Sequence, residues 1–72
     1  MMIKYEEHSI GHSHLMCCEY YPDKSAAERR QIELRVALLR PIFIQYKKSL
    51  KTSEGVYNES WFVYYYAQNK ES

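Results

Sequence analysis

Glycine and proline are scarce in this sequence, which has two of each in 72 residues. Because these residues dominate tight turns, a chain with so few of them is expected to contain few and long secondary-structure elements. A chain of this length forms one domain, residues 1–72, with a single thin core. Folding at this size buries only about 60% of the surface that the unfolded chain exposes, so a bound partner would add appreciably to stability.

Long apolar runs and targeting features are also lacking. The longest apolar run, from Trp61 to Ala67, is far shorter than the roughly 20 residues that a membrane-spanning helix needs. The first residues lead directly into charged positions, without the hydrophobic block of a signal peptide. Cys17 and Cys18 are adjacent, and neighbours on a strand point to opposite faces, so we expect two free thiols. These features predict a cytoplasmic protein.

No motif of catalysis is present in the sequence. There is no glycine-rich phosphate loop, no nucleophile elbow and no pair of carboxylates at a catalytic spacing. A small domain with one core also leaves little room for a concave pocket. We therefore expect neither enzymatic activity nor a cofactor.

Positive charge is concentrated in the middle of the chain, although the net charge is only +1. Eight of the ten lysines and arginines lie between residues 24 and 51, where two carboxylates accompany them. The two ends of the chain are acidic in consequence. A basic stretch of this kind can face either an acidic protein surface or a phosphate backbone.

The first region predicts a hairpin with strands over residues 2–8 and 12–21 and a loop over residues 9–11. A three-residue loop that ends on glycine is a common hairpin connection. This register places His8 opposite His12, and it separates the side chains into two sets. The set toward the core is Ile3, Tyr5, Leu15 and Cys17, and the outer set is Met2, Lys4, Glu6, His8, His12, His14, Met16, Cys18 and Tyr20.

The second region predicts one long helix over residues 25–51. Ser25 and Glu28 form a capping box at its start. Pro41 would lie on the side away from the apolar stripe and bend the helix toward whatever the stripe packs on. The alternative is two helices that meet at Pro41. The stripe recurs at alternating spacings of four and three: Ile32, Val36, Leu39, Phe43, Tyr46 and Leu50.

The same segment has a second apolar set. Leu34 and Leu38 belong to it, together with Pro41 and Ile42. A helix on a one-layer sheet needs only one apolar face, so a second face indicates that another surface is covered, by this chain or by a different one.

The third region predicts a strand over residues 60–67, with Val56 and Tyr57 as an extension or a short edge piece. Its side chains alternate between two apolar faces, as in a strand that is covered on both sides. The element order is then β-β-α-β. This order predicts a two-layer α+β domain, in which a three-stranded antiparallel sheet packs on one helix. The two faces of the last strand are Trp61, Val63 and Tyr65 on one side and Phe62, Tyr64 and Tyr66 on the other.

Metal ligands cluster weakly in the first hairpin. His8, His12 and His14 would share one face near the turn, with Cys17 and Cys18 further along the strand. Imidazole and thiolate are zinc ligands, but this spacing matches no known zinc motif. We interpret the histidines as the polar end of a hairpin and expect no metal site.

The first functional hypothesis is a non-catalytic protein-binding regulator or inhibitor that forms a homodimer. One helix shields one face of the predicted sheet, and too little chain remains to cover the aromatic side chains of the other face. Stand-alone domains of this size are often products of phages or mobile elements that block a host enzyme or a defence complex, as anti-CRISPR proteins do. The expected contact residues are Tyr20, Phe62, Tyr64, Tyr66, Leu34 and Leu38, with Arg29, Arg40 and Lys47 steering toward an acidic partner.

The alternative hypothesis is a small nucleic-acid-binding protein. Arg29, Arg40, Lys47 and Lys51 would lie along one flank of the long helix and could follow phosphates. The tyrosine-rich sheet face could stack unpaired bases. The two features would lie on opposite layers of the domain, so the protein-binding hypothesis is favoured.

Overall fold

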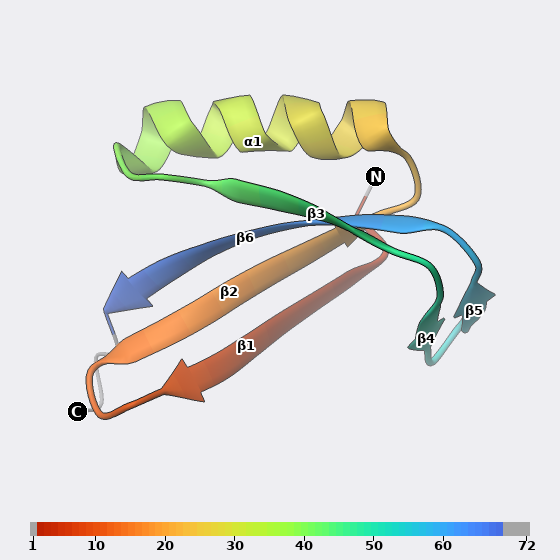
Figure 1. Ribbon diagram of the computed structural model, residues 1–72, viewed down its shortest axis with the longest axis horizontal. Helices are drawn as coiled ribbons and strands as arrows, with labels where there is room; N and C mark the ends of the chain where they lie inside the picture. The colour runs from red at the N-terminus through yellow and green to blue at the C-terminus, as the bar shows by residue number, and fades with distance from the viewer. Residues whose placement is uncertain (1, 69–72) are drawn as a thin grey trace.

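The computed structural model describes residues 2–68 and has an α+β fold with one helix (Figure 1). Four strands form an antiparallel sheet in the order β1-β2-β6-β3, and β4 and β5 form a separate two-stranded hairpin. The two-layer α+β prediction is confirmed, but the sheet has four strands because a fourth strand comes from the segment predicted as helix. The elements are β1 (Lys4–Ile10), β2 (His14–Tyr21), α1 (Lys24–Leu38), β3 (Phe43–Lys47), β4 (Leu50–Thr52), β5 (Gly55–Tyr57) and β6 (Ser60–Gln68).

The helix α1 ends at Leu38, so the predicted helix over residues 25–51 is wrong, as is the alternative of two helices. Leu39 adopts a left-handed conformation with φ of 53°, and its N–H donates to the carbonyl of Arg35 at 3.0 Å. Pro41 disfavours helical geometry at Arg40 and has no N–H of its own to continue the ladder. The chain therefore turns back and enters the sheet as β3, and Pro41 lies in the connection instead of bending a helix.

The N-terminus of α1 is capped by Asp23 and not by Ser25. The Asp23 carboxylate accepts a hydrogen bond from the backbone N–H of Ala26 at 2.7 Å. Asp23 has the extended backbone that an N-cap requires, whereas Ser25 already lies inside the first turn. The N-cap therefore lies two residues before the predicted one, and the helix begins at Lys24.

The first hairpin has a different register from the predicted one. Its turn covers residues 11–13, with Gly11 at a φ of +71°, so that His8 lies opposite Met16 and not opposite His12. The turn has moved by two residues. Because a shift of two preserves the alternation of the strand, Cys18 still faces away from the helix and its neighbour Cys17 points to the other face. Ile3, which was expected on the core face, instead packs against the cluster that contains Cys18.

The core lies between α1 and the sheet. Ala27 and Leu34 of α1 pack against Val63 at the centre of β6, and Ile42 closes the end where the chain leaves the helix. Gln31 Nε2 also donates to the carbonyl of Ile42 at 2.7 Å. The buried side chains of this core are Tyr21, Ala27, Leu34, Ile42 and Val63.

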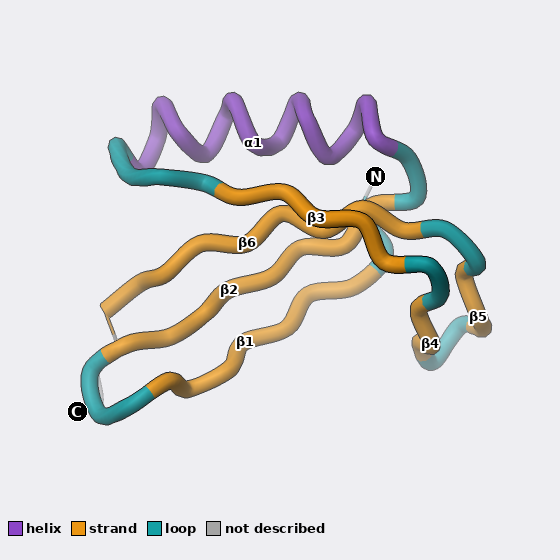
Figure 2. Tube along the Cα trace, viewed as in Figure 1, coloured by secondary structure: helices purple, strands orange, loops and turns teal. Residues whose placement is uncertain are grey.

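A second cluster lies on the opposite face of the sheet, where the β4–β5 hairpin folds over one end (Figure 2). Leu50 of β4 is buried against Cys18 and Tyr20 of β2. The expectation that nothing remains to cover this face is therefore wrong at that end. The hairpin supplies a cover because Leu50 and Lys51, predicted as the end of the helix, instead begin β4, which pairs with β5.

Candidate functional site

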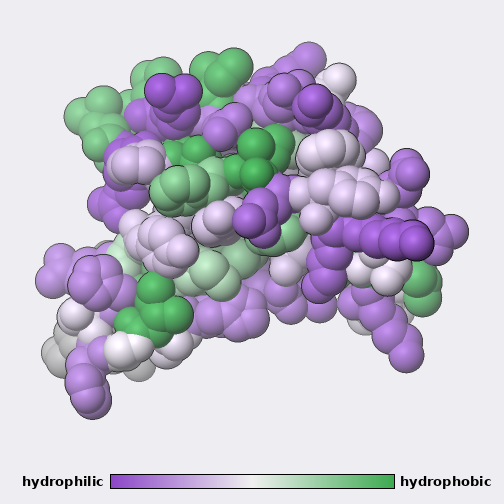
Figure 3. All heavy atoms as spheres, in the orientation of Figure 1, coloured by the Kyte–Doolittle hydropathy of each residue, from purple (hydrophilic) through white to green (hydrophobic). Residues whose placement is uncertain are grey.

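The apolar stripe that was predicted to form the core lies on the outside of α1. Ile32, Val36 and Leu39 are 62%, 73% and 88% exposed. The predicted stripe depended on a helix that continued through residues 43–50, and without that continuation the helix buries Ala27 and Leu34 instead. We call Ile32, Val36 and Leu39 the outer stripe. In Figure 3, hydrophobic atoms gather at the upper left of the molecule, over the C-terminal part of α1.

Charged side chains of both signs surround the outer stripe. Glu28 and Glu33 are exposed, and so are Arg29 and Arg35. A small apolar surface with a charged rim is typical of the contact surfaces of protein complexes. Of the predicted contact residues only Arg29 is among these side chains, and the sequence analysis had placed the three residues of the outer stripe inside the protein.

An aromatic row crosses the face of the sheet that α1 does not cover. The ring centroids of Tyr20 and Phe62 are 5.2 Å apart, and those of Phe62 and Tyr64 are 5.5 Å apart. Phe43 on β3 then stacks on Tyr64 at 5.2 Å with an interplanar angle of 24°. Three of these rings were predicted to share a face. Phe43 was missed because its segment was assigned to the helix.

Tyr20 is not available as a contact residue on this surface, because it is only 5% exposed. Its hydroxyl donates to Glu6 Oε1 at 2.8 Å, and Lys47 Nζ lies 5.7 Å from the centre of its ring. Burial and the hydrogen bond to Glu6 raise the pKa of Tyr20 well above its ordinary value. At this end, the aromatic row is buried and stabilises the fold, so it does not form a contact surface.

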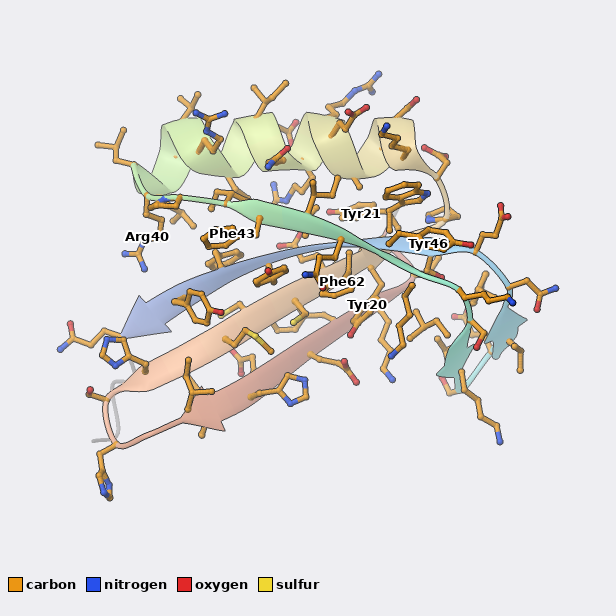
Figure 4. The ribbon with its side chains drawn as sticks, in the orientation of Figure 1. Tyr20, Tyr21, Arg40, Phe43, Tyr46 and Phe62 are labelled. Atoms are coloured by element: carbon orange, nitrogen blue, oxygen red, sulfur yellow. The ribbon has the colours of Figure 1, made fainter. Side chains whose placement is uncertain are left out.

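The other end of the aromatic row is open. Phe43 and Tyr66 are each 41% exposed, and both line a hollow of about 530 Å³ beside the C-terminal end of α1. Arg40 and His14 line the same hollow. Figure 4 shows Arg40 below the end of α1 and Phe43 next to it, at the start of β3. We call this hollow the sheet-end cavity.

The position of Arg40 follows from the strand register. β3 begins at Phe43, which lies opposite Tyr64, so β6 extends beyond the start of β3. The Arg40 guanidinium donates to the carbonyl of Tyr66 in that extension. Ser13 and His14 also line the cavity, and Ser13 Oγ lies 3.0 Å from His14 Nδ1. Within residues 2–68, no carboxylate lines the cavity.

The remaining predicted contact residues are dispersed over the molecule. Leu34 is 5% exposed and belongs to the core, so its assignment to a partner contact is wrong. Leu38 is half-buried and lines the sheet-end cavity. Arg29 lies on α1, Arg40 in the following connection and Lys47 on β3, so the predicted basic flank of a single helix is also wrong.

The histidines do not form a metal site in the part of the chain that the structure describes. His8 Nε2 lies 3.5 Å from Glu6 Oε1, and His14 lies beside Ser13. Within residues 2–68, no group of three or more potential ligands lies close enough to hold a metal ion, and His8, His12 and His14 are not brought together. Cys17 and Cys18 are buried free thiols, and burial raises the pKa of Cys18, which disfavours the reactive thiolate.

Comparisons with known proteins give no family. The chain matches no family model, no curated protein and no solved structure. Among residues 2–68 there is no helix whose length and apolar character would let it cross a membrane.

Proposed function

We propose that this chain is a non-catalytic protein-binding regulator or inhibitor that contacts its partner through the outer stripe of α1. The observation that carries the proposal is the exposure of Ile32, Val36 and Leu39, which are the most exposed of the large hydrophobic residues in residues 2–68. Their i, i+4, i+7 spacing is the pattern by which a helix presents anchor residues to a protein groove. Aliphatic side chains cannot stack on bases as aromatic rings do, so this surface favours a protein over a nucleic acid.

The charges around the outer stripe favour an acidic partner surface. On the exposed side of α1, Lys24, Arg29 and Arg35 outnumber the two glutamates. Opposite charge on a partner accelerates association, whereas the apolar centre determines how long a complex lasts. We infer that the partner offers an apolar groove with an acidic rim.

The proposed mode of action is occlusion of a partner surface. A binding domain without its own chemistry regulates another protein by covering a site or by blocking assembly. A cytoplasmic host enzyme or defence complex, targeted by the product of a phage or mobile element, is the proposed partner class. Alternatively, the outer stripe binds a second copy of this chain in a homodimer.

Photo-cross-linking tests this proposal directly. A benzophenone amino acid at position 36 places the reactive group in the outer stripe, and the same amino acid at position 54, in the exposed β4–β5 turn, is the matched control. Irradiation of cells that produce each variant should give a discrete cross-linked adduct of the chain with another protein from position 36 and none from position 54. An adduct at twice the mass of the chain identifies the homodimer. Identical adduct patterns from both positions, or no adduct from position 36, would contradict the proposal.

A nucleic-acid-binding role is the second candidate, and a separate observation favours it. The basic helix flank on which that hypothesis depended is not formed. The open end of the aromatic row does present Phe43 and Tyr66 beside Arg40. This arrangement is independent of the outer stripe and indicates a site of its own.

A further inference from the structure

We propose that the sheet-end cavity is a binding site for an unpaired nucleotide of single-stranded nucleic acid. The site combines exposed aromatic rings with a positioned guanidinium in one hollow. It uses neither the outer stripe nor a protein partner, so it is independent of the protein-binding proposal, and it rests on the second candidate function, nucleic-acid binding, for which it names the ligand.

The first requirement of such a site is a firm stacking surface. Phe43 and Tyr66 have ring centroids 6.1 Å apart and lie edge to face, and Phe43 is backed by the stacked ring of Tyr64. These contacts hold the two exposed rings in place before any ligand binds. The protein side chains therefore lose little conformational entropy when a base stacks on them. Stacking accepts any base with a free face, and only unpaired nucleotides offer one.

The second requirement is a counter-charge for phosphate. A guanidinium has five N–H groups, and the hydrogen bond from Arg40 to the carbonyl of Tyr66 orients the group while other N–H groups remain for a ligand. His14 lines the same hollow. Leu38 and Leu39 bring the C-terminal end of α1 to the cavity, and the partial negative charge of that end disfavours an anion. Arg40 is therefore the group on which phosphate binding depends.

The volume and lining of the cavity favour a nucleotide over an acidic peptide. A volume of about 530 Å³ lies within the range of sites for small ligands. An acidic side chain would satisfy Arg40 but would leave the two exposed rings without a flat partner. A nucleotide carries a flat ring and an anion in one unit, and the absence of lining carboxylates within residues 2–68 leaves no repulsion of phosphate from a lining side chain.

Fluorescence anisotropy with a labelled oligothymidylate and a labelled oligouridylate, each of about 12 nucleotides, measures the binding. At a low salt concentration of about 50 mM, the wild-type chain should bind at least one of the two strands. Arg40→Gln should weaken binding about tenfold. It should also reduce the slope of the logarithm of the affinity against the logarithm of the salt concentration by about one, which corresponds to one lost phosphate contact. Lys48→Gln removes the same charge from an exposed loop and should change the affinity less than about twofold.

Removal of the stacking surface is the second arm. Tyr66→Leu retains an apolar side chain but removes the flat ring, and it should weaken binding about tenfold. Val56→Ala changes no charge at a 61% exposed position on β5 and should bind as the wild type does. An oligonucleotide with 5-iodouracil should cross-link, on irradiation of the wild-type chain, to the peptide that contains Phe43 or to the one that contains Tyr66. The cross-link needs no variant, so it decides the question even if a substitution unfolds the domain.

Several results would overturn the nucleotide site. Absence of binding to both strands at low salt removes it. Equal weakening by Arg40→Gln and Lys48→Gln shows general charge attraction only. If an oligoglutamate peptide binds as tightly as the oligonucleotides, the cavity recognises acidic peptides and not bases.

Discussion

Arg30 on α1 and Glu19 on β2 join the two layers of the domain through a two-pronged ion pair. Arg30 Nε lies 2.8 Å from Glu19 Oε1, and Arg30 Nη2 lies 3.3 Å from Glu19 Oε2. The hydroxyl of Tyr21 donates to Glu19 Oε1 at 2.6 Å. Glu19 is only 5% exposed, so these donors replace the water that its carboxylate loses on folding. The pair links the side of α1 that carries Arg30 to β2.

Loss of Arg30 should destabilise the domain. In Arg30→Met, Glu19 keeps its buried position but loses its only cationic partner within residues 2–68. Removing one partner of a buried pair typically costs about 3–5 kcal/mol, and because the Arg30 side chain is partly exposed we expect about 2 kcal/mol. Urea unfolding measures the loss. Arg29→Met is the matched control on the exposed side, and equal effects of the two substitutions would show that the pair contributes nothing specific.

Replacement of Leu39, the left-handed cap residue of α1, by glycine should stabilise the domain. A non-glycine residue in this conformation costs about 1 kcal/mol or more, and the Leu39 side chain is 88% exposed, so its removal forfeits almost no burial. Leu39→Gly should therefore raise the free energy of unfolding by about 1 kcal/mol. Leu39→Ala keeps the strained conformation and should give no comparable increase. A lower stability of Leu39→Gly than of Leu39→Ala would show that the helix does not end here.

Stability should fall in alkaline solution. Burial and hydrogen bonds to Glu6 and Glu19 raise the pKa values of Tyr20 and Tyr21 above their ordinary value of 10.0. A raised pKa means that folding favours the neutral phenol, so this contribution is complete below about pH 10 and is lost as the pH rises beyond it. Urea unfolding at about pH 8 and about pH 11 measures the change.

A single substitution isolates the contribution of Tyr20 to this pH dependence. Tyr20→Phe removes the hydroxyl that donates to Glu6, so the variant should lose less stability between the two pH values than the wild type does. Tyr66→Phe changes an exposed ring and serves as the control. An identical loss in Tyr20→Phe and in the wild type would contradict the assignment.

The sequence predicts the strand alternation well and the helix poorly, for a physical reason. Alternation in residues 60–67 determines both faces of β6, because the two-residue period of a strand is strictly local. Phe43, Tyr46 and Leu50 fit the helical period as an extension of the outer stripe, but they also lie in a segment that follows Pro41. The backbone preference at Pro41 outweighs the hydrophobic pattern. A strand assignment after Pro41 would have brought Phe43 to the aromatic row.

The choice of buried helix face could not be derived from the helix alone. Two apolar sets are present, and the contacts that decide between them involve Ile42 and Val63, which lie outside α1. The ion pair of Arg30 with Glu19 acts in the same direction and joins residues 11 positions apart. The cavity residues Arg40 and Tyr66 are still further apart in sequence, so their proximity depends on the strand order.

The most direct test of the exposed outer stripe compares two alanine substitutions on α1 by urea unfolding. Leu34→Ala removes a side chain that is 5% exposed and should lower the free energy of unfolding by about 3 kcal/mol. Ile32→Ala removes one that is 62% exposed and should change it by less than about 0.5 kcal/mol. If Ile32→Ala instead costs as much as Leu34→Ala, the outer stripe is buried within the folded domain and the proposed protein-binding surface does not exist.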